Sequence, residues 1–360
     1  MAKLSSNKPT IGDVAKLAGV VPSTVSHVLN GTATISLDTK SKVMEAVEQL
    51  NYSPNAMARA LRQKKTKVLG VVLRDISSEF YARCTASIFE EARKDGYVVL
   101  ICDSAFDEER MKDGVNALIE RRVDGLIFVG GGNDEEILAK AKAAHIPFIL
   151  ADRNVPGEVS VEYDNFETVR KAVHALWENG YREYLYFGER EDIQKNLRDR
   201  YYGFLKGMEE CKLTPNNYRA VIGDEIVETD KYSGSYRYFK ERVHIQQPGK
   251  AVVLTSNDMI AMGVISAAIS SQIRVPGELA VIGFDDINVS KYYNPSLTTI
   301  RQNEKLLGQR CYEALKALIY GEPMINQGYL QQDLVIRESA VFPKHICEKY
   351  HFVDERGVYK

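Results

Sequence analysis

Several residues in the chain are of the types that catalyse reactions or hold metal ions. Asp285 and Asp286 stand side by side after the apolar run LAVIGF, where two carboxylates could form a metal site or an acid/base pair. No His, Cys or third carboxylate lies beside them in sequence, and the six histidines form no HxH or HExxH pattern. No GxSxG motif of a serine nucleophile is present either. The sequence therefore predicts no metal site and no catalytic residues, and we do not expect an enzyme.

Glycine and cysteine patterns give no cofactor site. Gly130-Gly131-Gly132 matches neither GxGxxG nor GxxxxGK[ST], the motifs whose backbone amides bind phosphates, and is more typical of a turn with a helix cap. The five cysteines are widely spread and include no CxxC pair, which favours reduced thiols over disulfides or zinc. We therefore expect no cofactor.

The composition and charge indicate a soluble protein of two or three domains with a basic N-terminal part. No stretch approaches the 18 or so apolar residues of a membrane span, and the N-terminus lacks the apolar run of a signal peptide, so we expect a cytoplasmic protein without membrane contact. Residues 1–67 hold ten of the 47 Lys and Arg but only four of the 49 Asp and Glu. A basic part on an acidic body suits phosphate contacts at one surface, although a solvated basic face is also common.

The elements that would position such contacts are short helices. Thr10 and Asp13 have the spacing of a capping box that opens one helix, which Gly19 can end. Pro22 suits the first turn of a second helix, which ends at Asn30-Gly31. Two short helices joined by a turn of three or four residues have helix-turn-helix spacing, a pattern that proteins without DNA-binding activity also show.

Two more helices are predicted after this pair. Ser36 can cap a third helix with a buried stripe of Val43, Met44, Val47 and Leu50. Ser53-Pro54-Asn55 can cap a fourth over residues 56–62, followed by the polar linker 63–67. A helix this short is marginal alone, so a frayed linker is the alternative.

From residue 68 the chain alternates apolar runs with amphipathic helices. The runs are VLGVVL, YVVLIC, GLIFVG, PFILA, YLYFG, AVVLTS and LAVIGF. This alternation predicts parallel sheets covered by helices. Ligands of such sheets bind beyond the carboxyl ends of the strands, so the residues just after each run are candidates for contact.

Long motifs resemble those of the lactose/galactose repressor (LacI/GalR) family. DVAKLAGVVPSTVSHVLNG and LNYSPNAMARALRQKKT resemble its DNA-binding head and hinge, and LRDISSEFYA, RRVDGLIFVG, RDRYYGF, TSNDMIAMG, VIGFDDI and PSLTTIRQ resemble its regulatory domain. The implied fold is a small all-α helix-turn-helix head over 1–52 and a hinge helix and linker over 53–67. An α/β two-lobed periplasmic-binding-protein-like (type I) domain over 68–342 follows.

The resemblance also implies the division of that domain, with lobe one over about 68–164 and 304–331 and lobe two over about 165–303 and 332–342. Residues 343–360 run past the usual family end, as a flexible tail or a cover over a dimer edge.

The resemblance assigns DNA contacts residue by residue. Base edges in the major groove would meet Pro22, Ser23 and His27, and backbone phosphates would meet Thr24, Ser26 and Asn30. The hinge and minor-groove residues would be Asn55, Ala58, Leu61 and Arg62, with Leu61 wedged into a pyrimidine–purine step.

Two positions depart from the commonest family pattern. Val21 stands where a capping Ser or Thr is usual, which puts one helix cap and one phosphate contact in doubt. His27 replaces the more frequent Arg, as in the purine repressor branch, and offers at most one hydrogen bond per base edge. The alternative for His27 is a solvent-facing residue without a role.

The resemblance further implies a small-molecule effector between the lobes. Its contacts would be Phe80, Tyr81, Asp152, Arg198, Asn257, Asp285 and Gln302. Carboxylates, amides and an aromatic face suit a polyol, so a sugar is favoured. In structural alternatives Asp285 caps a helix, Arg198 pairs with Asp199 or Glu191, and Phe80 belongs to the core.

We therefore expect a homodimeric repressor, associated with the bacterial nucleoid when bound, that reads an approximately palindromic double-stranded DNA operator. The sign of its response to the effector stays open. The rivals to a sugar are a purine-like base and a phosphorylated carrier protein, although two carboxylates in the cleft argue against a nearby phosphate. A cytosolic sugar-binding or sugar-processing protein whose head only oligomerises is the alternative of a different class.

Overall fold

The computed structural model describes residues 9–53, 65–131, 134–190, 194–227, 230–324 and 328–357. The chain forms two compact units, Met1–Thr66 and Lys67–Lys360, which we call the head unit and the core unit. The predicted hinge contacts Asn55, Ala58, Leu61 and Arg62 lie outside the described residues.

Over residues 9–53, the head unit forms three helices around a small apolar core. They are α1 (Ile11–Ala18), α2 (Pro22–Asn30) and α3 (Leu37–Gln49). Their fully or nearly buried side chains are Val14, Ala15, Val25, Val43 and Ala46. The capping box of Thr10 and Asp13 is formed at the start of α1, and Gly19 ends that helix with φ 67°.

The prediction that Met44 belongs to the buried apolar stripe of α3 is wrong, because Met44 is 48% exposed. Ala46 is buried in its place, at 3% exposed. Because Val43 and Ala46 are three residues apart, they lie on one face of α3, whereas Met44 is turned about 100° away from Val43.

Lobe one of the core unit is built on a parallel sheet in the order β2-β1-β3-β4-β5. Its strands are β1 (Val68–Leu73), β2 (Val98–Asp103), β3 (Gly125–Val129), β4 (Phe148–Ala151) and β5 (Ser160–Val161). Its helices are α5 (Glu79–Lys94), α6 (Glu108–Glu120), α7 (Glu135–Ala143) and α13 (Glu304–Tyr320). Because successive side chains of a strand point to opposite faces, Leu69 and Val71 of β1 pack on the α5 and α13 side, while Val72 packs on the α6 and α7 side.

Lobe two has a sheet in the order β11-β10-β9-β8-β6-β7, parallel except for β11. Its strands are β6 (Glu183–Gly188), β7 (Tyr218–Ile222), β8 (Ala251–Thr255), β9 (Leu279–Asp285), β10 (Thr298–Gln302) and β11 (Gln332–Val335). Its helices are α8 (Asn165–Glu178), α9 (Lys195–Glu210), α10 (Asp224–Val227), α11 (Lys231–Arg242), α12 (Asp258–Ser270), α14 (Lys344–Tyr350) and the short η1 (Asn288–Lys291). Two apolar clusters, one on each face of this sheet, form its core.

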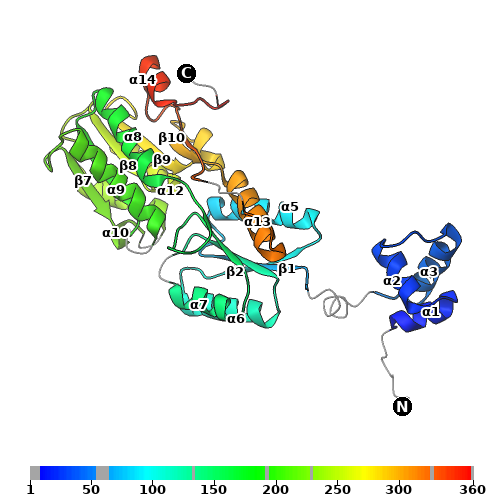
Figure 1. The fold of residues 1–360 in the computed structure, drawn as a ribbon. Coiled ribbons are helices and arrows are strands. Elements are labelled where there is room, and N and C mark those ends of the chain that lie inside the picture. Colours follow the sequence, from blue (N-terminus) through cyan, green and yellow to red (C-terminus); the bar gives the residue numbers. More distant parts are fainter. Residues whose placement is uncertain are drawn as a thin grey trace, which may run out of the picture. The chain divides into compact units, whose positions relative to one another are not determined.

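The chain passes between the lobes three times. It leaves lobe one after β5, returns from β10 into α13, and crosses again to β11. Figure 1 shows α13, late in the chain, beside α5, an early helix, and both pack on the same face of the first sheet. The cleft between the lobes is therefore bordered by loops from distant parts of the sequence.

The C-terminal segment packs on lobe two. Ile346, Cys347, Phe352 and Val353 are at most 5% exposed, and Val353 forms a β-bridge with Val335. Their burial in the lobe-two core means that residues 343–357 do not form a flexible tail.

Candidate functional site

The exposed face of α2 carries the residues predicted to contact DNA bases. Pro22, Ser23 and His27 are exposed, while Val25 on the same helix is fully buried against α1 and α3. Ser23 and His27 are four residues apart and therefore lie on one face of α2. A helix held from behind by its apolar side and presenting small polar groups in front can enter a major groove.

Local hydrogen bonds fix part of this face. The His27 Nδ1 atom lies 2.9 Å from the Thr32 hydroxyl, which orients the ring. Asn30 donates to the Ser26 carbonyl oxygen at 2.7 Å and to the Ser26 hydroxyl at 3.2 Å, so two of the predicted phosphate contacts hold each other. Thr24 is half-buried. Val21 makes no side-chain cap at the start of α2, which leaves backbone N–H groups there for another acceptor.

The second site is a cleft between the lobes, where the carboxyl ends of strands from both sheets meet. It encloses about 40 Å³. Its lining residues are Ser78, Phe80, Tyr81, Phe106, Asp152, Glu189, Gln194, Asn196, Leu197, Arg200, Lys231, Asn257 and Asp285. Five of the seven predicted effector contacts are among them: Phe80, Tyr81, Asp152, Asn257 and Asp285.

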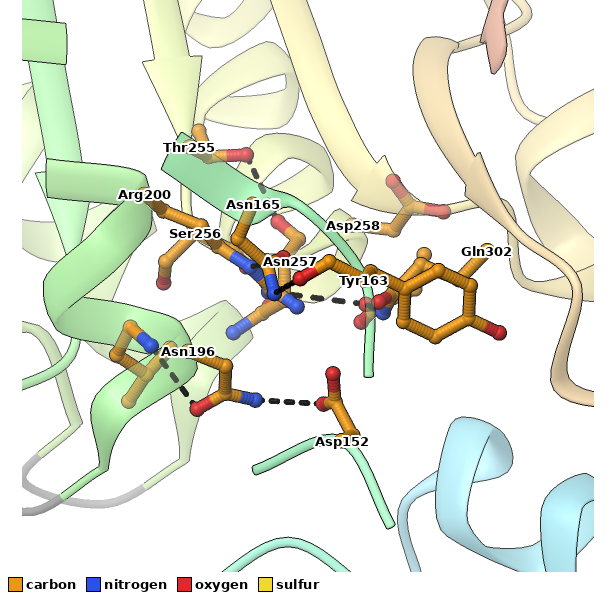
Figure 2. A network of polar contacts seen from close by, with 12 residues as sticks. Asp152, Tyr163, Asn165, Asn196, Arg200, Thr255, Ser256, Asn257, Asp258 and Gln302 are labelled. Carbon is orange, nitrogen blue, oxygen red and sulfur yellow. Dashed lines mark hydrogen bonds and ion pairs between the residues drawn. The ribbon is translucent and has the colours of Figure 1, made fainter. Parts of the chain in front are cut away.

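Asp152 presents an unused acceptor to the cleft. It follows β4, is 2% exposed, and adopts a left-handed backbone conformation with φ 55°. Its Oδ2 accepts a hydrogen bond from the Asn196 amide at 2.6 Å, which joins lobe one to lobe two, as Figure 2 shows. Its buried Oδ1 has no hydrogen-bond partner among the described residues. A buried acceptor in this state is costly unless a ligand supplies the donor.

The predicted effector contact at Arg198 has to be corrected, because the Arg198 side chain is exposed and does not line the cleft. Arg200, two residues later on α9, is 4% exposed and lines the cleft. It donates to the Ser256 carbonyl oxygen at 2.6 Å and to the Asn165 Oδ1 at 3.0 Å (Figure 2). Two residues on a helix are about 200° apart, so only one of the two arginines can face the cleft.

Asp285 forms the floor of the cleft on lobe two, and Gln302 supports it from behind. Gln302 does not line the cleft but lies behind it, 1% exposed, and donates from Nε2 to Asp285 Oδ1 at 2.7 Å. Arg200 Nη1 lies 3.8 Å from the same oxygen. Gln302 therefore positions Asp285, whose backbone is also left-handed with φ 110°.

Asn257 both caps a helix and reaches the cleft. Its Oδ1 accepts from the Ile260 N–H at the start of α12, and its Nδ2 donates to Glu189 Oε1 at 2.7 Å. Lys231 Nζ lies 3.1 Å from the same Glu189 oxygen. The cleft thus holds a mixture of acceptors and donors rather than charge of one sign.

Burial shifts the acidity of the cleft carboxyls. Removal from water raises the pKa of Asp285 to about 8, against the opposing effect of the Arg200 guanidinium. The same cause raises the pKa of Asp152 to about 6, against Arg200 and the Asn196 hydrogen bond. Such shifts are concentrated at functional sites.

Phe80 and Tyr81 form the aromatic wall on lobe one. Their rings pack edge to face with centroids 5.5 Å apart. The Tyr81 hydroxyl donates to Gln194 Oε1 of lobe two at 3.2 Å. The wall is therefore held to the opposite lobe across the cleft.

Sequence reasoning missed several lining residues, and signals for some of them were present. Glu189 comes directly after the run YLYFG, where a ligand contact is expected. Arg200 stands four residues before the buried Phe204, on the apolar face of its helix. Asn196 and Lys231 follow no such pattern.

Within the described residues, no His, Cys, Asp and Glu side chains gather in a group of three or more that could hold a metal ion. In the same part of the chain, every helix is too short or too polar to cross a membrane.

Comparisons with known proteins agree with this arrangement. Residues 10–55 match the family of bacterial regulatory proteins of the lacI type, and residues 173–340 match a periplasmic binding protein-like domain. The chain is 34% identical over 338 residues to the HTH-type transcriptional repressor PurR of Haemophilus influenzae (strain PittEE), covering 92% of this chain and 98% of the relative. It is 31% identical to the regulator RegA of Clostridium saccharobutylicum over 337 residues, covering 92% and 99%.

Among solved structures, the lac repressor dimer bound to operator and the anti-inducer ONPF superposes with a TM-score of 0.79 at 27% identity, covering 92% of this chain and 99% of that one. The relatives are transcriptional regulators, and the match spans both the helix-turn-helix head and the two-lobed core. The family inferred from the sequence motifs is confirmed: the chain belongs to the lacI family of bacterial regulatory proteins.

Proposed function

We propose that this transcriptional repressor binds DNA as a homodimer and is controlled by a sugar bound in the interlobe cleft. The observation that carries the choice of ligand is the buried Asp152 Oδ1 without a donor, next to the amide and guanidinium groups of Asn196 and Arg200. A hydroxyl group both donates and accepts, so it can serve Asp152 and a neighbouring donor together. The rings of Phe80 and Tyr81 would cover the C–H face of the sugar.

DNA recognition would need two heads. One α2 helix presents only a few groups to base edges, and a symmetric dimer requires an approximately palindromic operator. The basic charge of residues 1–67 would neutralise phosphates, and the repressor would then act at the bacterial nucleoid.

Control would come from lobe closure. Bonds such as Asn196 to Asp152 and Tyr81 to Gln194 span the cleft, and a ligand that replaces them changes the balance between open and closed lobes. A coupling free energy of about 1–3 kcal/mol between the two sites changes operator affinity by about 5- to 150-fold.

The test is operator binding measured by fluorescence anisotropy, with duplexes from the DNA around its own gene and titration with sugars, sugar phosphates and purines. We expect one duplex to bind above random DNA, with an affinity that falls steeply with salt. His27→Ala should relax base preference, whereas Lys40→Ala on α3 is the matched control on the head.

Release or tightening of this complex by a sugar supports the proposal. If a purine is the only active ligand, the proposal of a sugar effector is wrong. If no duplex binds better than random DNA, sequence-specific DNA recognition is contradicted.

A further inference from the structure

Lobe one holds a second cavity, of about 70 Å³, at the carboxyl edge of its sheet. It is lined by Arg74, Phe106, Asp107, Glu108, Met111, Lys112, Asp134, Glu136 and Ile137. We call it the Arg74 cavity. Phe106 lines both this cavity and the interlobe cleft, so the two spaces adjoin at that ring.

Arg74 carries a buried charge for which the described residues supply no counter-ion. It follows β1 and is 8% exposed, and its Nε is buried with no hydrogen-bond partner among the described residues. Asp134 is a buried carboxylate on the cavity wall, but it already accepts hydrogen bonds from Arg153 through both oxygens, at 2.6 and 2.7 Å. An unpaired buried guanidinium is unfavourable in the empty protein and favours an anion in the cavity.

The surrounding backbone favours an anion as well. The cavity lies between the ends of β1 and β3, where the order of a 2-1-3-4-5 sheet changes direction and where such folds bind ligands. It is bordered by the first turns of α6 and α7, whose N-terminal N–H groups and dipoles attract negative charge. Asp134, the residue that precedes α7, makes no capping hydrogen bond, since its carboxylate faces Arg153.

Two of the acidic residues at the rim have partners of their own. Glu136 pairs with Lys112 and Lys140, each at 3.4 Å, and the Asp107 carboxylate accepts from the Arg110 N–H to cap α6. Glu108 is exposed. None of these carboxylates forms an ion pair with Arg74 in the described structure, so the positive charge at the inner wall stays available.

Phe106 separates this charge from the cleft. Phe106 is 46% exposed, and the Arg74 guanidinium carbon lies 5.3 Å from its ring centroid. Ala105 and Phe106 both have left-handed backbones, with φ 48° and 61°, a strained conformation that is concentrated at binding sites. A ligand in the cleft therefore needs to extend past only one ring to reach Arg74.

We propose that the effector is an anionic sugar, whose hydroxyls lie in the interlobe cleft and whose carboxylate or phosphate enters the Arg74 cavity and pairs with Arg74. The two cleft carboxylates, Asp152 and Asp285, do not line the Arg74 cavity, so the anion would not face them. This inference rests on the proposed sugar-binding function and adds the charge class of the ligand. The planar guanidinium fork binds both kinds of anion through two hydrogen bonds.

The experiment compares the wild-type chain with Arg74→Gln, and with Arg93→Gln as the matched control, because Arg93 is an arginine of the same lobe whose side chain on α5 is 65% exposed and lines neither space. Thermal unfolding of the core is followed with glucose, galactose, gluconate, glucuronate, galacturonate and glucose 6-phosphate, at constant ionic strength. For each ligand that shifts the Tm, calorimetric titration gives its Kd.

We expect an anionic sugar to bind at least about tenfold more tightly than its neutral counterpart, as one charge-assisted pair implies. Arg74→Gln should lose this preference and Arg93→Gln should keep it. The empty Arg74→Gln protein should be as stable as the wild type or more so, because an unpaired charge has been removed. Comparison of the sugar acids with glucose 6-phosphate identifies whether a carboxylate or a phosphate enters the Arg74 cavity.

Equal affinities of the wild type for an anionic sugar and its neutral counterpart would overturn this inference and leave the proposed function standing. Arg74→Gln behaving like the wild type with every anionic sugar would overturn it too. If Arg74→Gln fails to fold, Arg74→Lys replaces it, and a preference for the anion that persists with a weaker Kd is then the expected result. If a purine rather than a sugar controls operator binding, the proposed sugar-binding function itself is contradicted.

Discussion

At the scale of single residues, Arg200 makes contacts that a lysine cannot reproduce. Its guanidinium bonds to Ser256 and Asn165 and lies 3.6 Å from the Phe284 ring centroid. Arg200→Lys should lower the free energy of unfolding of the core by about 1–3 kcal/mol, because buried acceptors lose their donor. Arg198→Lys, on the exposed face of the same helix, should change it by less than about 0.5 kcal/mol. Urea unfolding measures both, and equal effects would contradict the placement of Arg200.

The raised pKa of Asp285 predicts a pH-dependent stability of the empty core. The pKa of the Asp285 carboxyl is about 8 in the folded chain, against an ordinary value of 3.8. Between these two pH values the carboxyl is protonated in the folded chain and ionised in the unfolded chain. Its contribution to the free energy of unfolding is therefore fully present below about pH 4 and is lost as the pH rises through about 8. Asp152, with pKa about 6, adds to the same trend at lower pH.

Asp285→Asn mimics the protonated carboxyl, so the fall in Tm between pH 6 and pH 8 should be smaller than in the wild type. Asp113→Asn, at an exposed carboxylate of lobe one, is the control. Scanning calorimetry at several pH values checks this, and an unchanged slope in Asp285→Asn would speak against burial as the cause.

The sequence predicts which residues line the cleft where one motif residue follows a strand, and fails to do so where the rotation of a helix decides. Asp152 and Asp285 stand directly after β4 and at the end of β9, so the sheet edge places them in the cleft. The motif RDRYYGF offers two arginines two residues apart, and only the burial of Phe204 on one face selects Arg200. Gln302 is close to the cleft but is covered by Asp285, which the sequence does not reveal.

At the scale of elements, the contact of α8 with α9 depends on a glycine. A Cβ at Gly203 would lie 2.3 Å from the Phe166 carbonyl oxygen, an atom of the backbone that cannot rotate away. Gly203→Ala should therefore destabilise the core by about 1–3 kcal/mol or more through overpacking. Lys206→Ala on α9, where the side chain is 43% exposed, should stay within about 0.5 kcal/mol. The measurement is chemical unfolding, and a neutral Gly203→Ala would show that the helices separate at little cost.

Elements with local signals were predictable, and those fixed by tertiary contacts were not. The capping box of α1 and the alternating apolar runs identify their own helices and strands. Residues 343–357 carry no clear period because they form only a short helix and a bridge, and their apolar side chains complete a core built by other segments.

At the scale of the whole molecule, the head and core units have separate hydrophobic cores. We expect two unfolding transitions in scanning calorimetry. A ligand at about 100 times its Kd should raise the free energy of unfolding of the core by about 2.7 kcal/mol and leave the head transition unchanged. A chain that begins at Lys67 should keep the core transition and its ligand response but lose operator binding. One transition that shifts as a whole would contradict this division.

The cleft is narrow in this structure. Its free volume of about 40 Å³ is too small for a sugar ring, and lobe contacts include Glu79 Oε1 accepting from the Asn288 N–H at 2.8 Å. Ligand entry therefore requires the lobes to separate, so exchange of the ligand is tied to breaking these contacts.

The three passages of the chain between the lobes have a consequence for its resistance to proteases. A single cut at any one passage, after β5, before α13 or before β11, leaves two intact covalent links between the lobes. The nicked chain would separate into fragments on a denaturing gel while its lobes stay assembled in solution. Separation of the two lobes in the cell therefore requires unfolding of a whole lobe, and cleavage of one passage between them is not enough.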